Sequence, residues 1–220
     1  MFMTKAWSHH SYLRARIENV LIINLPAYIH KVEHLLEEEA KQLTRKVEDE
    51  AKWLDDEGRI TVYNAYYGDF LHMEQIFPQF HRRSMLVSIY SLFEYSLDAI
   101  CREGALLRHC NNTLEDLPGK VKGIYRSKLY LKRVLKIKLS WCNEHWRNIQ
   151  IYGQIRNIIT HNGGVLDKIN ENVEDYIKRN DILDHDNENI LIINNGFLLI
   201  VVDDIVNFLK WLFESMPEFS

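Results

Sequence analysis

Residues 143–164 read NEHWRNIQIYGQIRNIITHNGG, and the helix that this stretch predicts sets the fold class. Its apolar side chains recur every three or four residues, which places them on one face of an α-helix. These side chains are Trp146, Ile149, Tyr152, Ile155, Ile158 and Ile159. Gly163 or Gly164 suits the left-handed residue that commonly ends a helix. The pattern therefore predicts an amphipathic helix over about 143–162 with one face in a core.

Helical periodicity recurs on both sides of this stretch, and it predicts several further helices. Their approximate ranges are 27–57 (a long acidic helix ending near Gly58), 81–107, 120–137 (a basic helix), 171–179 and 203–215. Residues 59–80 are rich in tyrosine and contain Gly68 and Pro78, which predicts irregular structure or short helical pieces there.

One segment near the C-terminus is typical of strands. The apolar runs 190–193 and 197–202 flank Asn194-Asn195-Gly196, and Asn-Gly readily adopts the positive φ angles of a tight turn. We therefore expect a β-hairpin over 190–202. The fold class that follows is all-α, a helical bundle with a long N-terminal helix and one small β-hairpin.

The composition predicts one ordinary domain. The 220 residues are 46% hydrophobic and 26% charged, which is typical of globular proteins, so we expect a single domain over 1–220. Residues 1–80 form an N-terminal extension in this interpretation, and residues 81–220 form the core. The three cysteines form no CxxC pair, so we expect no disulfide framework, no metal site and no cofactor. The most apolar stretch is interrupted at Asn194–Gly196, so we expect no membrane span and a cytoplasmic protein.

The charges are unevenly distributed although the net charge is only −4. Residues 33–57 carry ten acidic side chains against four basic ones, whereas residues 117–143 carry eight basic side chains and no acidic one. The basic segment suits RNA phosphates. The expected RNA contacts are Lys120, Lys122, Arg126, Lys128, Lys132 and Arg133. A solvated helix face, or a contact with the acidic helix 33–57 of the same or a partner chain, explains the same pattern.

Arg156, Asn157 and His161 lie together in the last turns of the helix over 143–162. Arginine offers a charged planar fork to phosphate, histidine titrates near neutrality, and asparagine can hold an imidazole or a phosphate oxygen. These groups suit attack of an RNA 2′-hydroxyl on its neighbouring phosphate. Arg156 and His161 are about 140° apart around the helix, so we expect a composite site between two copies of the chain. Helix capping is the alternative role for both residues.

Glu94 is a further candidate, because it interrupts an otherwise apolar helix. A carboxylate in such a place needs a partner or a cleft. It either orients Arg156 or His161, or it faces solvent or pairs locally with an arginine. The local arginines are Arg82, Arg83 and Arg102.

Arg156-Asn157, three residues and His161 resemble the Arg-x4–6-His signature of the HEPN superfamily, including its frequent asparagine after the arginine. The flanking Tyr152–Ile155 and Asn162–Gly164 resemble stand-alone prokaryotic members, as do the expected hairpin and terminal helix. The resemblance implies a helical bundle that dimerises with its two motifs facing each other. Many members are metal-independent ribonucleases of toxin–antitoxin, anti-phage or RNA-processing systems. It also implies Arg156 and His161 as the catalytic pair, Asn157 as an assisting residue, and an antitoxin or defence protein as a partner.

Three classes of function remain open on these residues. The first is a metal-independent endoribonuclease acting as a homodimer. The second is a non-catalytic HEPN-like module that binds RNA or nucleotide, or that serves as an assembly surface. The third is a structural or partner-inhibited protein, in which the acidic helix binds a partner and the motif residues merely end their helix.

Overall fold

The computed structural model describes residues 9–117, 119, 121–138, 141, 143–167 and 169–216. The chain is mostly helical and contains one two-stranded antiparallel hairpin, so the predicted all-α class with a small hairpin near the C-terminus is confirmed. Among the described residues, no helix combines the length and the apolar character needed to cross a bilayer.

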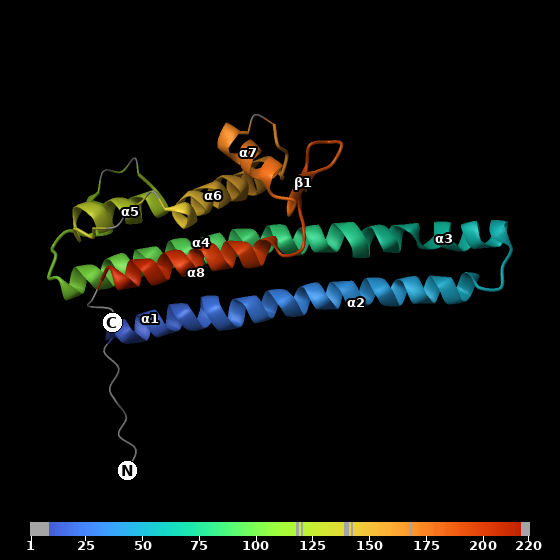
Figure 1. The fold of residues 1–220 in the computed structure, drawn as a ribbon, viewed down its shortest axis with the longest axis horizontal. Coiled ribbons are helices and arrows are strands. Elements are labelled where there is room, and N and C mark those ends of the chain that lie inside the picture. The colour runs from blue at the N-terminus through green and yellow to red at the C-terminus, as the bar shows by residue number, and fades with distance from the viewer. Residues whose placement is uncertain are drawn as a thin grey trace, which may run out of the picture.

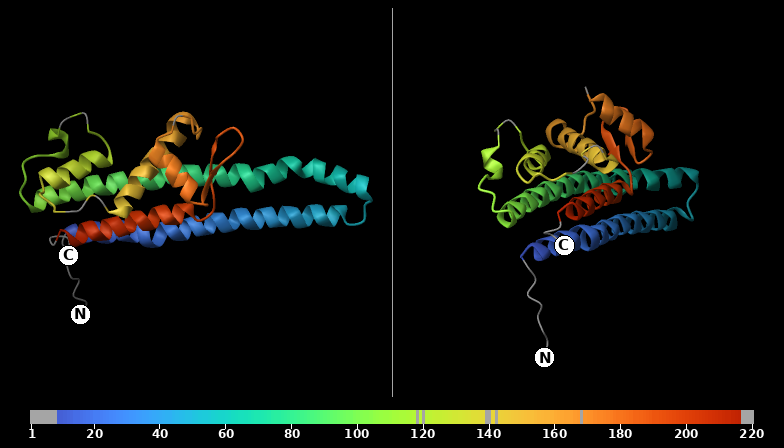
Figure 2. Two further views of the ribbon diagram at one scale, coloured as in Figure 1. Left: turned by 45° about the horizontal axis from the view of Figure 1, so that its top comes forward. Right: turned by 60° about the vertical axis from the view of Figure 1, so that its left-hand side comes forward.

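The helices are arranged in three layers (Figures 1 and 2). The first layer runs continuously through α1, the π-helical turn η1 and α2, and the middle layer holds α4 and α8. The third layer holds α5, α6 and α7. The bounds are α1 His9–Glu18, η1 Asn19–Asn24, α2 Leu25–Ala51, α3 Asp56–Leu71, η2 His72–Ile76, α4 Phe77–Leu107, η3 Leu114–Asp116, α5 Ile124–Arg133, α6 Glu144–Asn162, α7 Glu171–Arg179, β1 Leu183–His185, β2 Leu191–Ile193 and α8 Phe197–Glu214.

The core lies where α4, α6 and α8 meet. Phe93 of α4, Trp146 of α6 and Phe208 of α8 are fully buried there. The Phe208 ring lies 5.1 Å from the Trp146 ring and 5.9 Å from the Phe93 ring, centroid to centroid. These aromatic contacts fix α6 against the middle layer. They thereby position the face of α6 that carries Arg156.

The prediction for residues 27–80 is wrong in two respects. The long helix ends at Ala51 rather than near Gly58, because Asp55 accepts a hydrogen bond from the Gly58 backbone nitrogen (2.9 Å) and so caps a new helix, α3. Residues 59–80 are also helical, since α3, η2 and α4 follow one another without a break. Pro78 causes no interruption, because it lies in the first turn of α4, where its missing N–H is tolerated.

The pair α2 and α3 forms an arm that extends beyond the rest of the molecule (Figure 1). None of the residues of α3, all of which the structure describes, is buried. At the base of this arm, Glu33 of α2 accepts two hydrogen bonds from Arg82 of α4, at 2.8 and 2.7 Å. Arg82 also donates to the Ile193 carbonyl oxygen of β2 (3.0 Å), so one side chain connects α2, α4 and the hairpin.

The location of the hairpin was also predicted wrongly. β2 pairs with β1, in the register Leu183–Ile193 to His185–Leu191, and Gly196 is the N-cap of α8 with a φ of 94°. The run 197–202 therefore begins a helix rather than a strand. A short apolar run does not distinguish a buried helix from a strand, and α8 is apolar on nearly every face of its first two turns.

The remaining helices match their predictions more closely. The helix predicted over 143–162 is α6, and the one predicted over 171–179 is α7. The basic helix is shorter than expected, Ile124–Arg133, because Gly123 has a φ of 58° before it and Lys136 a φ of 55° after it. The last helix begins six residues earlier than expected, at Phe197.

Candidate functional site

α6 carries Arg156, Asn157 and His161 near its C-terminal end, and both ends of this helix are fixed. The Asn143 side chain accepts a hydrogen bond from the Trp146 backbone nitrogen (2.8 Å), which caps the first turn. At the other end Gly163 is left-handed, with a φ of 63°, and the Gly164 N–H donates to the Ile158 carbonyl oxygen (3.1 Å). The helix therefore stops directly after His161 and Asn162, as predicted from the two glycines.

A groove of about 230 Å³ surrounds Arg156. Its walls come from α4, from the start of α5 and from α6, three elements that are distant in the sequence. The lining residues are Tyr90, Glu94, Lys122, Gly123, Ile124, Tyr125, Gln150, Gly153, Gln154, Arg156 and Asn157. The structure thus brings together Arg156, Asn157, Glu94 and Lys122, four of the residues that the sequence indicated.

Arg156 is held in this groove, but its hydrogen-bonding capacity is mostly unused. Its Nη1 donates to the Asn157 side-chain oxygen (2.9 Å), and its guanidinium carbon lies 5.9 Å from the centroid of the Tyr90 ring. Nη2 lies 3.8 Å from a Glu94 carboxylate oxygen, which is an ion pair but is beyond hydrogen-bond distance. Nε is buried and has no hydrogen-bond partner among the described residues. The N–H groups on the two Nη atoms, apart from the one donated to Asn157, therefore remain available to an anion in the groove.

Glu94 faces Arg156, which distinguishes between the roles considered for it. The three arginines proposed as local partners, Arg82, Arg83 and Arg102, contact other groups instead. Burial raises the pKa of the Glu94 carboxyl above its ordinary value, the positive charge of Arg156 lowers it, and the nearby Asp98 raises it. Because burial dominates, the pKa of Glu94 is raised although Arg156 lies beside it.

Two residues that line the groove are glycines, and the structure has no room for a side chain at either of them. A Cβ atom at Gly123 would lie 2.6 Å from a Glu94 carboxylate oxygen, and a Cβ at Gly153 would lie 2.7 Å from Cζ of Tyr90. Both distances are shorter than any relaxed contact, so a side chain at either position would displace the groove wall. Burial, together with the negative charge of Glu94, raises the pKa of the Tyr90 hydroxyl, so this group stays protonated at neutral pH.

His161 does not line the Arg156 groove. It is exposed in the last turn of α6, one turn beyond Asn157. Within one chain, the groove therefore contains the arginine, the asparagine and the carboxylate but not the imidazole. This arrangement agrees with the angular offset of about 140° between Arg156 and His161 on an ideal helix.

The basic segment does not form one uniform face. Arg126 pairs with Asp98 of α4 through Nη2 (2.7 Å), and this contact fixes α5 to α4. The Lys128 ammonium lies 5.0 Å from the Trp146 ring and 5.3 Å from the Trp141 ring, which is a cation–π arrangement. Two of the six expected RNA contacts thus have internal partners.

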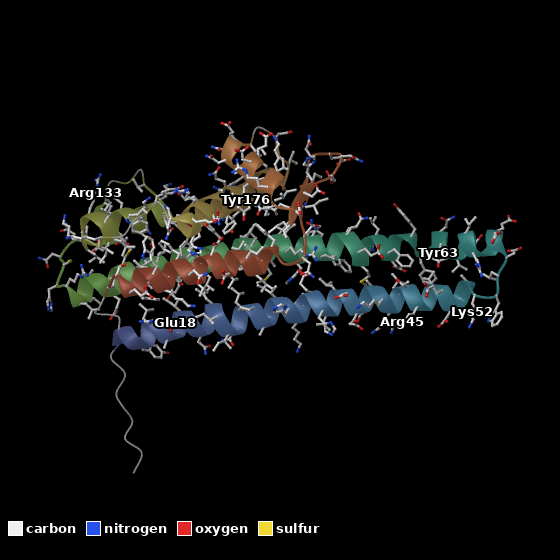
Figure 3. The ribbon with its side chains drawn as sticks, in the orientation of Figure 1. Glu18, Arg45, Lys52, Tyr63, Arg133 and Tyr176 are labelled. Atoms are coloured by element: carbon white, nitrogen blue, oxygen red, sulfur yellow. The ribbon has the colours of Figure 1, made fainter. Side chains whose placement is uncertain are left out.

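The other four basic residues are distributed differently. Lys122 is exposed and lines the Arg156 groove, and Lys120 lies outside the described residues. Lys132 and Arg133 are exposed at the end of α5, and Figure 3 shows Arg133 at the opposite end of the third layer from Tyr176 of α7. α5 and α2 lie on opposite sides of the middle layer, so the basic residues of α5 are separated from the acidic helix of the same chain (Figures 1 and 2).

Sequence reasoning missed part of the groove. Tyr90 and Gln154 were not considered as site residues, and Gly153 was quoted only as part of a resemblance. Gly153 did carry a usable signal, because glycine inside a helix is costly unless another group approaches closely. Its position opposite Tyr90 depends on how α4 packs against α6, which the sequence pattern does not specify.

Among the described residues, no three His, Cys, Asp or Glu side chains gather closely enough to hold a metal ion. No protein-family model, no curated protein and no solved structure matches this chain.

Proposed function

We propose that this protein is a metal-independent endoribonuclease of the HEPN type, and that the Arg156 groove holds the scissile phosphate. The observation that carries the proposal is the guanidinium of Arg156, which lines an open groove with most of its donors unused and with Lys122 in the same groove. A phosphate diester accepts several charge-assisted hydrogen bonds from such a fork.

In the proposed reaction, the 2′-hydroxyl oxygen attacks the adjacent phosphorus and the bond to the 5′-oxygen breaks. A base takes the 2′ proton and an acid protonates the leaving 5′-oxygen, so the products are a 2′,3′-cyclic phosphate and a 5′-hydroxyl. Arg156 stabilises the charge on the non-bridging oxygens, and Asn157 and Glu94 fix the orientation of its guanidinium.

His161 is the proposed proton-transfer group, and a second copy of the chain supplies it. In one chain it lies exposed outside the groove, whereas an antiparallel pairing of two α6 helices would bring His161 of one copy to Arg156 of the other. The homodimer is thus part of the proposal.

The decisive experiment measures cleavage of a single-stranded RNA in the presence of a chelator. We expect the wild type to cleave, Arg156→Ala to lose about 100-fold or more in rate, and His161→Ala to lose a comparable factor. Arg102→Ala and His34→Ala are matched controls on exposed side chains of α4 and α2, and they should cleave as the wild type does. Equal cleavage by His161→Ala and the wild type would refute its role.

The composite site has its own test. Arg156→Ala and His161→Ala chains are mixed under conditions that exchange subunits, and cleavage is followed with time. Each mixed dimer keeps one intact pair, so activity should reappear in the mixture. No recovery, in a mixture shown to contain mixed dimers, would contradict the shared site.

A non-catalytic RNA-binding module is the second candidate function. It is favoured by the Glu94 carboxylate, which faces Arg156 inside the groove, and by the position of His161 outside it. Salt-dependent RNA binding that Arg156→Ala weakens, together with no cleavage by the wild-type dimer, would establish this function instead.

A further inference from the structure

A second groove, of about 640 Å³, lies between α6 and α7. Its volume is within the range of sites for small molecules or single nucleotides. Side-chain amides and one phenol dominate its lining, and these include Asn148, Gln150, Gln154, Asn172, Tyr176 and Asn180. No residue of this groove was among the site residues expected from the sequence.

Asp204 of α8 lies beneath this groove and fixes the orientation of its polar groups. The Asp204 side chain is 10% exposed, and its carboxylate is contacted by His145 Nδ1 (2.6 Å), Asn148 Nδ2 (3.0 Å) and the Tyr152 hydroxyl (2.5 Å). A carboxylate accepts hydrogen bonds and donates none, so the amide of Asn148 must turn its NH₂ group towards Asp204. The Asn148 side-chain oxygen is then the atom left for the groove, and it is a hydrogen-bond acceptor.

The same argument fixes the Tyr176 hydroxyl. Tyr152 has one hydroxyl hydrogen, and that hydrogen is committed to Asp204. The hydrogen bond between the hydroxyls of Tyr152 and Tyr176 (3.1 Å) must therefore be donated by Tyr176. The lone pairs of the Tyr176 oxygen remain for the groove, so Asp204 sets two acceptors, one on α6 and one on α7.

The two grooves adjoin each other across α6. Gln150 and Gln154 line both of them, and the Gln150 amide donates to the hydroxyl of Tyr125 in the Arg156 groove (2.9 Å). Two basic and two acidic side chains also line the α6–α7 groove: Arg147, Arg179, Glu144 and Asp175. Arg179 pairs with Asp175 (3.4 Å), so the lining is balanced in charge, which suits a neutral base rather than a second phosphate. Because the two grooves share Gln150 and Gln154, a single strand with one phosphate at Arg156 can place a neighbouring base between α6 and α7.

We infer that the α6–α7 groove recognises the base next to the phosphate bound at Arg156, and that it selects adenine and cytosine through the amino group at N6 or N4. The inference rests on the proposed function and names the substrate class of that site. Adenine and cytosine present NH₂ donors, N6 and N4, to the acceptors of Asn148 and Tyr176. Uracil has a carbonyl oxygen, O4, where cytosine has its amino group, so it would place an acceptor against the half-buried acceptors of Asn148 and Tyr176 and leave them unpaired.

The test measures fluorescence anisotropy of the full-length protein with 2′-O-methyl oligonucleotides, which cannot be cleaved by 2′-hydroxyl attack. The probes are single-stranded oligo-A, oligo-C and oligo-U of equal length. We expect oligo-A and oligo-C to bind about tenfold more tightly than oligo-U. In Asn148→Leu the difference should fall below about twofold because oligo-A and oligo-C weaken, while oligo-U binding stays the same.

Two further variants make the result specific. Tyr176→Phe removes the second acceptor with little change in shape, so it should reduce the preference as well, and it decides the question if Asn148→Leu does not fold. Asn207→Leu is the matched control, because Asn207 also donates to a neighbouring aspartate, Asp203 (2.9 Å), but does not line the groove. This control should keep the tenfold preference.

The outcomes separate the two proposals. Equal binding of all three oligonucleotides by the wild type, or a preference that survives both groove variants, would overturn the base-recognition inference and leave the proposed function in place. If no oligonucleotide binds at all, the proposed function fails, and the inference built on it fails too.

Discussion

The ion pair between Glu33 and Arg82 at the base of the arm provides the most quantitative prediction. The two side chains are 10% and 14% exposed, and two charge-assisted hydrogen bonds of 2.7 and 2.8 Å connect them. Glu33→Gln removes the negative charge and leaves the guanidinium of Arg82 buried without its counter-ion. Breaking a buried pair from one side costs about 3–5 kcal/mol, and we expect the lower limit because glutamine retains one acceptor oxygen.

In a chain of 220 residues, each kcal/mol lowers the melting temperature by roughly 2–4 °C. A loss of about 3 kcal/mol therefore predicts a melting temperature roughly 6–12 °C below that of the wild type. Thermal unfolding followed by far-ultraviolet circular dichroism measures it. Glu37→Gln is the control on the same helix, since Glu37 is an exposed partner of Lys41 (2.8 Å), and its melting temperature should match the wild type.

The double variant Glu33→Leu with Arg82→Met tests the cause of the loss. It removes both charges together, and the Ile193 carbonyl oxygen still accepts a hydrogen bond from the Gln79 side chain (3.0 Å). We expect it to recover most of the stability that Glu33→Gln loses. The reasoning is refuted if Glu33→Gln is as stable as Glu37→Gln, or if the double variant is no more stable than Glu33→Gln.

Three further predictions concern α3, α6 and the Arg156 groove. Gly163→Ala should lower the free energy of unfolding in urea by about 1–2 kcal/mol because of the φ of 63°, whereas Gly68→Ala, at an exposed helical site, should raise it by about 0.5–1 kcal/mol. Burial raises the pKa of Glu94 in the folded protein, so folding favours the protonated side chain. The contribution of Glu94 to the stability of the fold is therefore complete below its ordinary pKa of 4.5, and it is lost as the pH rises through the pKa that Glu94 has in the folded protein. Glu94→Gln should therefore melt higher than the wild type near neutral pH, and this advantage should vanish near pH 4; an equal difference at both pH values would contradict it. Gly153→Ala should displace the Tyr90 ring and so weaken the RNA binding proposed for this groove, and unchanged affinity in an anisotropy titration would show that the wall tolerates the methyl group.

The sequence predicted α6 well because its signals are local. The periodic apolar side chains, the Asn143 cap and the two glycines all act within one helix, so both of its ends lie within one residue of the prediction. Glu94 was likewise recognised from a local conflict, a carboxylate among apolar neighbours. That Arg156 is its partner depends on the packing of α4 against α6, which hydrophobic periodicity alone does not specify.

The errors arose where a residue has two conformational roles. Pro78 and Gly68 usually interrupt structure, but Pro78 occupies a first helical turn and Gly68 lies in a solvent-facing helix. Gly196 combines a left-handed φ with the start of α8, a geometry that a hairpin turn also uses. Asp204 was overlooked for another reason, because its three donors come from a different helix, α6, and meet only in the folded protein.

The position of α8 has a consequence for how the chain folds during its synthesis. This helix packs against α2, α4 and α6, yet it follows every other described element in the sequence. While the ribosome is still making residues 197–214, the faces that α8 covers on those three helices are exposed to water. The earlier helices can pair with one another, but this core closes only when α8 has emerged. We therefore expect nascent chains to display a large apolar surface until α8 has been made, and chains that stop before Phe197 to aggregate rather than fold.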